Sequence, residues 1–114
     1  MAERIVNIKS KEFALRVIKL YKYLYDKKEL ILSKQLLRSG TSIGANLAEA
    51  EFAISRKEFI AKSQIALKEC AETRYWIELL YNAKLITKKE FESIYSDCIE
   101  LLKMLVSSLK TLKE

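Results

Sequence analysis

The stretch Arg38-Ser-Gly-Thr-Ser-Ile-Gly-Ala-Asn46 contains both glycines of this 114-residue sequence. As a loop it would resemble a phosphate-binding nest, but it lacks the G-x-x-x-x-G-K-[ST] spacing and no expected strand precedes it. As a helix it places Gly40, Gly44 and Ala48 in one row of small residues, four apart. Such a row lets a neighbouring helix approach closely, and this packing offsets the cost of about 1 kcal/mol for each helical glycine. We therefore predict a helix in close contact with another helix.

A second row in this region is polar and predicts a network between two helices. Its members lie on this helix and on the next one: Gln35, Arg38, Ser42, Asn46, Glu49, Glu69 and Glu72. If the chain turns back near residues 54–55, the numbers of facing residues add up to about 110, which places Arg38 opposite Glu72. We expect these two side chains to form a partly buried ion pair that fixes the register of the helices. The same reasoning pairs Arg74 with Asp97 at the surface.

Capping signals divide the chain into four helices joined by short loops. Ser55 and Thr87 each precede a glutamate by three residues, which is the capping-box pattern, and Asp26 with Glu29 resembles it. The predicted helices span residues 10–25, 27–54, 56–83 and 88–112. Short connections make consecutive helices antiparallel neighbours. The sequence thus predicts an all-α fold, an up-down antiparallel four-helix bundle in one domain over residues 1–114.

Composition supports this fold class and excludes several kinds of chemistry. Two glycines and no proline are too few for the many turns of a β-rich fold. The absence of histidine excludes histidine acid–base catalysis, Ser-His and Cys-His nucleophile pairs and histidine-ligated metals. We therefore expect a non-enzymatic protein with no cofactor and no metal.

The cysteines and the apolar runs indicate a compartment. Cys70 and Cys98 lie at apolar helical positions, as expected of buried free thiols in a reducing cytosol. No apolar run approaches the ~18 residues of a membrane span, and the first residues do not form a secretion segment. We expect a cytoplasmic protein without membrane contact.

The positive charge is concentrated in the first third of the chain. The net charge is +6; residues 1–38 hold ten Lys or Arg and four Asp or Glu, and the remaining residues hold equal numbers of each. This asymmetry indicates an anionic partner such as RNA or DNA, with a solubilising surface as the alternative. The side chains predicted to contact phosphates are Lys9, Arg16, Lys19, Lys22, Lys27 and Lys28. Tyr23 is the tyrosine of this segment expected to be exposed.

The predicted fourth helix has a wider apolar stripe than one small bundle core needs. Excess apolar surface indicates a second contact, and another copy of the chain is the expected partner. The residues predicted to form this oligomer interface are Leu102, Val106 and Leu109.

Two motifs in succession resemble those of a known family. Residues 35–50, QLLRSGTSIGANLAEA, are similar to the signature of four-helix-bundle proteins encoded in intervening sequences of bacterial 23S ribosomal RNA genes. Residues 55–60, SRKEFI, and 65–80, IALKECAETRYWIELL, resemble the third helix of that family. The resemblance covers about residues 10–110. The chain departs from the pattern at two places, since many members have proline near Gly44 and glycine in place of Ala50.

The resemblance implies a bundle that assembles as a homopentamer, and it assigns no reaction. Relatives include the accessory variability determinant of diversity-generating retroelements, which implies a reverse transcriptase as a partner. The family's recurrent polar positions correspond to the polar row described above. Two classes of function remain open. A nucleic-acid-binding oligomeric accessory protein is favoured by the charge asymmetry, and a structural or protein-interaction scaffold is favoured by the wide apolar stripe.

Overall fold

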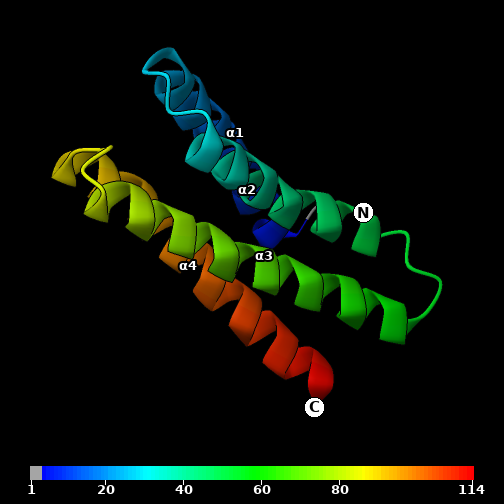
Figure 1. Ribbon diagram of the computed structural model, residues 1–114. Helices are drawn as coiled ribbons and strands as arrows, with labels where there is room; N and C mark the ends of the chain where they lie inside the picture. Colours follow the sequence, from blue (N-terminus) through cyan, green and yellow to red (C-terminus); the bar gives the residue numbers. More distant parts are fainter. Residues whose placement is uncertain (1–3) are drawn as a thin grey trace.

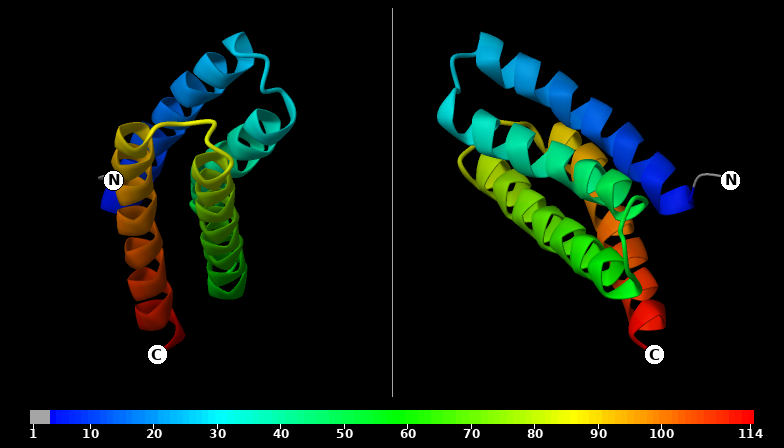
Figure 2. Two further views of the ribbon diagram at one scale, coloured as in Figure 1. Left: turned by 60° about the vertical axis from the view of Figure 1, so that its left-hand side comes forward. Right: turned by 90° about the vertical axis from the view of Figure 1, so that its right-hand side faces the viewer.

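The computed structural model describes residues 4–114 as four long helices joined by short loops (Figure 1). The helices are α1 (Ile5–Asp26), α2 (Ile31–Ala50), α3 (Arg56–Asn82) and α4 (Lys88–Lys113). Each helix runs antiparallel to the one before it, and the molecule measures 44 × 22 × 20 Å (Figure 2). The predicted all-α, up-down antiparallel four-helix bundle is confirmed.

Apolar side chains at helical spacing meet along the axis of the bundle. Each helix contributes a stripe of residues three or four apart, because this spacing places them on one face. The largest fully buried ones include Val17, Leu24, Leu36, Ile43, Leu47, Ile77, Leu80, Leu101 and Leu105. No helix within residues 4–114 is both long enough and apolar enough to cross a membrane.

The two cysteines are free and fully buried between α3 and α4, as expected. The Cys70 thiol donates to the main-chain carbonyl of Cys98 at 3.6 Å, and the Cys98 thiol donates to that of Cys70 at 3.7 Å. Burial and this neighbouring thiol raise the pKa of Cys98, with the hydrogen bond to Cys70 as the largest cause. Cys98 therefore stays protonated at neutral pH.

The predicted starts of the third and fourth helices are confirmed. The Ser55 hydroxyl accepts a hydrogen bond from the Glu58 amide at 3.0 Å. At α4 the capping box is complete, because the Thr87 hydroxyl accepts from the Glu90 amide at 3.1 Å and the Glu90 carboxylate accepts from the Thr87 amide at 2.7 Å.

The predicted ends of the first, third and fourth helices lie within one residue of the observed ends, and the three remaining boundaries need correction. The first helix begins at Ile5 rather than near residue 10, and Ser10 is buried inside it, where its hydroxyl donates to the Asn7 carbonyl at 2.8 Å. The second helix spans residues 31–50 rather than 27–54. The expected capping box at Asp26 and Glu29 does not form. Glu29 instead accepts a hydrogen bond from the Leu32 amide at 2.8 Å.

The loops after α1 and α3 share one geometry, a Schellman motif. In the first, Lys28 has a left-handed φ of 65°, its amide donates to Tyr25, and the next amide, that of Glu29, donates to Leu24, both at 2.9 Å. Lys84 repeats this arrangement after α3 with a φ of 62°. Glycine usually occupies this position because a side chain strains the left-handed backbone. The chain has lysine at both.

The small-residue row of α2 brings this helix against α1. A Cβ atom at Gly40 would lie 2.8 Å from both methyl carbons of Val17, and one at Gly44 would lie 3.1 Å from the Ser10 hydroxyl. Ala48 is exposed and lines a groove between α1 and α2. The close approach therefore occurs at the two glycines and does not extend to Ala48.

The bundle is asymmetric in how closely its helices pack. Consecutive helices share extensive contacts, whereas α1 and α4 meet sparsely. In Figure 1 the hairpin of α1 and α2 and the hairpin of α3 and α4 diverge toward the ends that carry their loops. This divergence leaves the second half of α1 and the start of α4 to line a cleft.

Candidate nucleic-acid interface

The basic residues predicted to contact phosphates are all exposed, but they differ in their partners. Lys19, Lys22 and Lys28 take part in no ion pair within residues 4–114. Lys11 and Lys34, which the sequence analysis did not select, are exposed as well. We call Lys19, Lys22 and Lys28 the unpaired lysines, meaning those among the six predicted phosphate contacts that form neither an ion pair nor an aromatic contact in the described part of the chain.

Two of the residues predicted to contact phosphates instead form ion pairs with acidic residues of α4. The Lys9 ammonium lies 2.8 Å from the Glu100 carboxylate, and this hydrogen bond raises the pKa of Lys9. Arg16 pairs with Asp97, and its guanidinium also donates to the hydroxyl and carbonyl of Ser93 at 2.7 and 3.2 Å. The expected pairing of Arg74 with Asp97 is wrong, because Asp97 pairs with Arg16. Arg16 therefore joins α1 to α4.

Lys27 instead packs on a tyrosine. Its ammonium lies 4.4 Å from the centroid of the Tyr23 ring, and a hydrogen bond to Tyr23 raises its pKa. Tyr23 is 37% exposed. The contact keeps an aromatic ring and a cation together at the end of α1.

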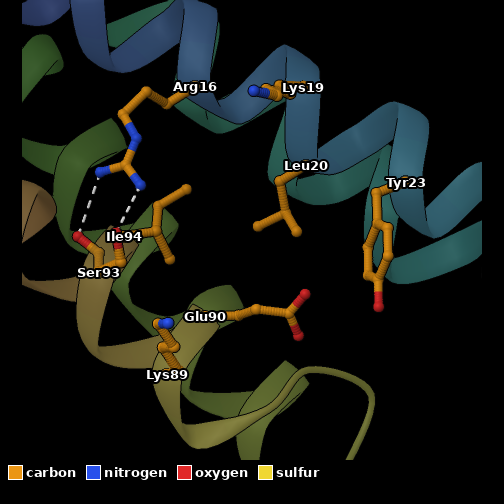
Figure 3. A pocket seen from close by; sticks show the side chains of 8 residues that line it. All are labelled: Arg16, Lys19, Leu20, Tyr23, Lys89, Glu90, Ser93 and Ile94. Carbon is orange, nitrogen blue, oxygen red and sulfur yellow. Dashed lines mark hydrogen bonds between the residues drawn. The ribbon is translucent and has the colours of Figure 1, made fainter.

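A cleft of about 450 Å³ opens between α1 and α4 (Figure 3). Its apolar lining comes from Leu20 and Ile94, and Tyr23 adds an aromatic ring. Its polar lining comes from Arg16, Lys19, Lys89, Glu90 and Ser93. In Figure 3 the Glu90 carboxylate points toward the space between Leu20 and Tyr23. Lys89, Glu90 and Ser93 were not selected from the sequence.

The cleft is electropositive, with one ionised carboxylate inside it. Hydrogen bonding from the Thr87 backbone is the largest cause that lowers the pKa of Glu90, and Lys27 and Tyr23 lower it further. Glu90 is therefore charged at neutral pH. Lys19 and Lys89 supply two unpaired positive charges around it, and the charge of Arg16 is shared with Asp97. These two lysines of the cleft attract an anion, and the Glu90 carboxylate can accept a hydrogen bond from a ligand.

The polar row between α2 and α3 forms in part. The Arg38 guanidinium donates to the Glu72 carboxylate at 2.7 Å, and a second nitrogen lies 3.8 Å from Glu69. Glu49 contacts Lys62 at 2.8 Å. The expected partial burial of the Arg38–Glu72 pair is wrong for the single chain, because the Arg38 side chain is 57% exposed. Its attraction is screened by water accordingly.

The remaining members of that row do not cross between helices. The Ser42 hydroxyl donates to the Arg38 carbonyl at 2.6 Å, and the Asn46 amide donates to the Ser42 carbonyl at 2.8 Å, all within α2. Gln35 is exposed. A buried contact that the sequence analysis missed joins the same helices, where the hydroxyls of Ser39 and Thr73 lie 2.8 Å apart.

The three residues predicted for an oligomer interface have different environments. Leu109 is buried within the chain, with 3% of its surface exposed, and Leu102 is partly buried against the core. Val106 is 50% exposed. The most exposed apolar side chains lie elsewhere, on the loop between α2 and α3, where Phe52 is 85% and Ile54 is 92% exposed.

Comparisons with known proteins assign the chain to a family. No curated protein matches the sequence. A crystal structure at 1.70 Å of a protein described as of unknown function, from the S23 ribosomal protein family of Bacteroides thetaiotaomicron VPI-5482, is 54% identical. The match covers 93% of this chain and 99% of that one, with a TM-score of 0.91. Residues 3–107 match the model of the family described as 23S rRNA-intervening sequence protein, and the chain therefore belongs to this family.

Proposed function

We propose that this protein is a non-enzymatic, oligomeric accessory protein that binds nucleic acid through the basic surface of α1. The observation that carries the proposal is the exposure of the unpaired lysines Lys19, Lys22 and Lys28 on α1 and the loop that follows it. Exposed cations on one element form the electrostatic footprint of a nucleic-acid-binding surface.

The acidic residues of α4 neutralise part of the basic surface of α1. Glu100 and Asp97 engage Lys9 and Arg16, so the side of α1 that faces α4 is partly neutralised. Lys19 and Lys22 form no ion pair within residues 4–114 and remain available to phosphates. Contacts of this kind position a protein on the backbone without reading bases, so binding should be weakly sequence-selective and strongly salt-dependent.

The test compares two double variants with the same change in charge. Lys19→Gln with Lys22→Gln removes two cations from α1, and Lys103→Gln with Lys110→Gln removes two exposed cations from α4. Arg16 is left intact because it joins the two helices. The readout is fluorescence anisotropy of labelled RNA and DNA oligonucleotides over a salt series.

We expect the α1 variant to bind more weakly and to flatten the dependence of log K on log salt, by about 0.7–0.9 for each phosphate that the variant no longer neutralises. The α4 variant should stay close to the wild type. The proposal fails if the wild type binds neither RNA nor DNA at low salt, or if the two variants behave alike.

Oligomerisation is the second part of the proposal. A ring of copies would repeat the α1 surface, so that modest contacts add through avidity. Val106 is the appropriate probe, since Leu102 and Leu109 belong wholly or partly to the core of the single chain. Light scattering should show an oligomer, a pentamer by family resemblance, and Val106→Glu should reduce its mass while the helical signal stays intact. A wild type that is monomeric at micromolar concentration contradicts this part.

A scaffold that binds other proteins is the alternative. It is favoured by Phe52 and Ile54, because side chains this large and this exposed are typical of interaction surfaces. This function becomes the better account if nucleic acid is not bound.

A further inference from the structure

The cleft between α1 and α4 has the size and lining of a site for a flat, partly apolar ligand. Its volume of about 450 Å³ falls within the range of ligand pockets. Leu20 and Ile94 supply apolar surface beside the ring of Tyr23. Lys27 lies over the ring of Tyr23, which itself lines the cleft. A planar aromatic group would find a stacking partner there.

Cations from both helices surround this apolar lining. Lys19 of α1 and Lys89 of α4 are exposed and form no ion pair within the described part of the chain. Arg16 is held in place by Ser93 and Asp97. An aromatic and apolar interior with cations around it suits a base that carries a phosphate. It suits neither a purely apolar ligand nor a small inorganic anion.

The acceptor inside the cleft adds a preference among bases. One oxygen of Glu90 accepts from the Thr87 amide, and the carboxylate points toward the space between Leu20 and Tyr23 (Figure 3). Cytosine, adenine and guanine each have an exocyclic amino group that can donate to a carboxylate. Uracil and thymine present carbonyl oxygens at the corresponding position, which the charge of Glu90 repels.

We infer that this cleft receives one unpaired, amino-bearing base of a single-stranded nucleic acid, between Tyr23 and Leu20, with its phosphates near Lys19 and Lys89. The inference rests on the proposed function and names the form of nucleic acid bound. A base inside a duplex reaches such a cleft only after it leaves the stack, which costs a few kcal/mol. A single strand offers its bases without that cost, so it binds more tightly at equal length and salt.

The experiment measures anisotropy of labelled oligo(dC), oligo(dU) and a mixed-sequence duplex of the same length, at pH 7.5 and constant salt. The single strands should bind more tightly than the duplex, and oligo(dC) more tightly than oligo(dU). Tyr23→Ala should weaken oligo(dC) binding about fivefold or more without affecting the duplex. Tyr25→Ala is the matched control, because Tyr25 is 52% exposed on α1 and does not line the cleft.

Two further variants keep the test independent of Tyr23. Glu90→Gln retains the capping box, since glutamine serves at that position, and should reduce the preference for oligo(dC) over oligo(dU). Lys89→Gln should weaken single-strand binding more than Lys88→Gln, which removes the same charge from the adjacent residue outside the cleft. Circular dichroism confirms that each variant is folded.

The outcomes separate this inference from the proposed function. If single strand and duplex bind equally and the cleft variants match their controls, the inference is overturned while backbone binding by α1 stands. If the wild type binds none of the three probes at low salt, both are overturned.

Discussion

Replacing Gly40 with alanine tests whether the contact between α1 and α2 is as close as the structure shows. In an open helix this change would stabilise the protein by about 1 kcal/mol, because alanine has the higher helix propensity. Here the new Cβ would lie 2.8 Å from both methyl carbons of Val17, which is fully buried. Valine has one strongly preferred rotamer in a helix, so it cannot turn away. Overpacking of this kind costs typically about 1–3 kcal/mol.

The clash outweighs the propensity gain, and we expect Gly40→Ala to lower the free energy of unfolding by about 1 kcal/mol. Urea titration followed by helical circular dichroism at fixed protein concentration measures this, and the melting temperature should fall by about 4 °C. Gly44→Ala should cost less, because its Cβ meets a single hydroxyl at 3.1 Å. Val17→Ala should be destabilising alone, yet less so in the Gly40→Ala background, with a coupling of about 1–2 kcal/mol. A stabilised Gly40→Ala protein, or strictly additive effects of the two changes, would refute the reasoning.

Three further predictions concern a left-handed lysine, a capping glutamate and the two buried cysteines. Lys84→Gly should raise the free energy of unfolding by about 0.5–1 kcal/mol, since relief of left-handed strain exceeds the entropy that glycine adds to the unfolded chain; an unchanged urea midpoint would contradict this. Because the pKa of Glu90 is lowered on folding from an ordinary value near 4.5, its stabilising effect is present above that pH and disappears as pH falls through the lowered pKa. Urea titrations at about pH 7 and pH 3 should therefore show a smaller acid destabilisation for Glu90→Gln than for the wild type. Cys70 and Cys98 should resist Ellman's reagent in the folded protein and react together once denaturant unfolds it, whereas rapid labelling of the native state would show that they are accessible.

The starts of α3 and α4 could be predicted because the apolar periodicity and a hydroxyl-bearing capping residue indicate the same boundary. Ser55 and Thr87 cap the helices that the sequence analysis assigned to them. The missed boundaries lack such signals. Lys28 stands where glycine would mark a loop, so residues 27–30 were predicted as the first turn of the second helix. The end of α2 at Ala50 is equally unmarked, because neither glycine nor proline stands there.

The basic residues of α1 could be predicted from the sequence, but their acidic partners on α4 and the cleft were missed. The partners depend on which residues face each other across the bundle. The numbers of facing residues add up to about 110 for Arg38 with Glu72, as the sequence analysis expected. They also do so for Lys9 with Glu100 and for Arg16 with Asp97. The same rule applied between the first and last helices would have found the acidic partners on α4. The cleft itself could not be predicted, because it depends on the divergence of two hairpins rather than on a residue pattern.

The sparse contact between α1 and α4 has a consequence for the order of folding. Helices adjacent in the chain pair locally, and such pairings close short loops and form fast. The contact of α1 with α4 must instead close a loop of about 80 residues, which costs more chain entropy and is rewarded by few contacts. It should therefore form last and open first, and the Lys9–Glu100 and Arg16–Asp97 ion pairs stabilise its closed form. Opening along this seam would widen the cleft while the three remaining helix pairings stay folded.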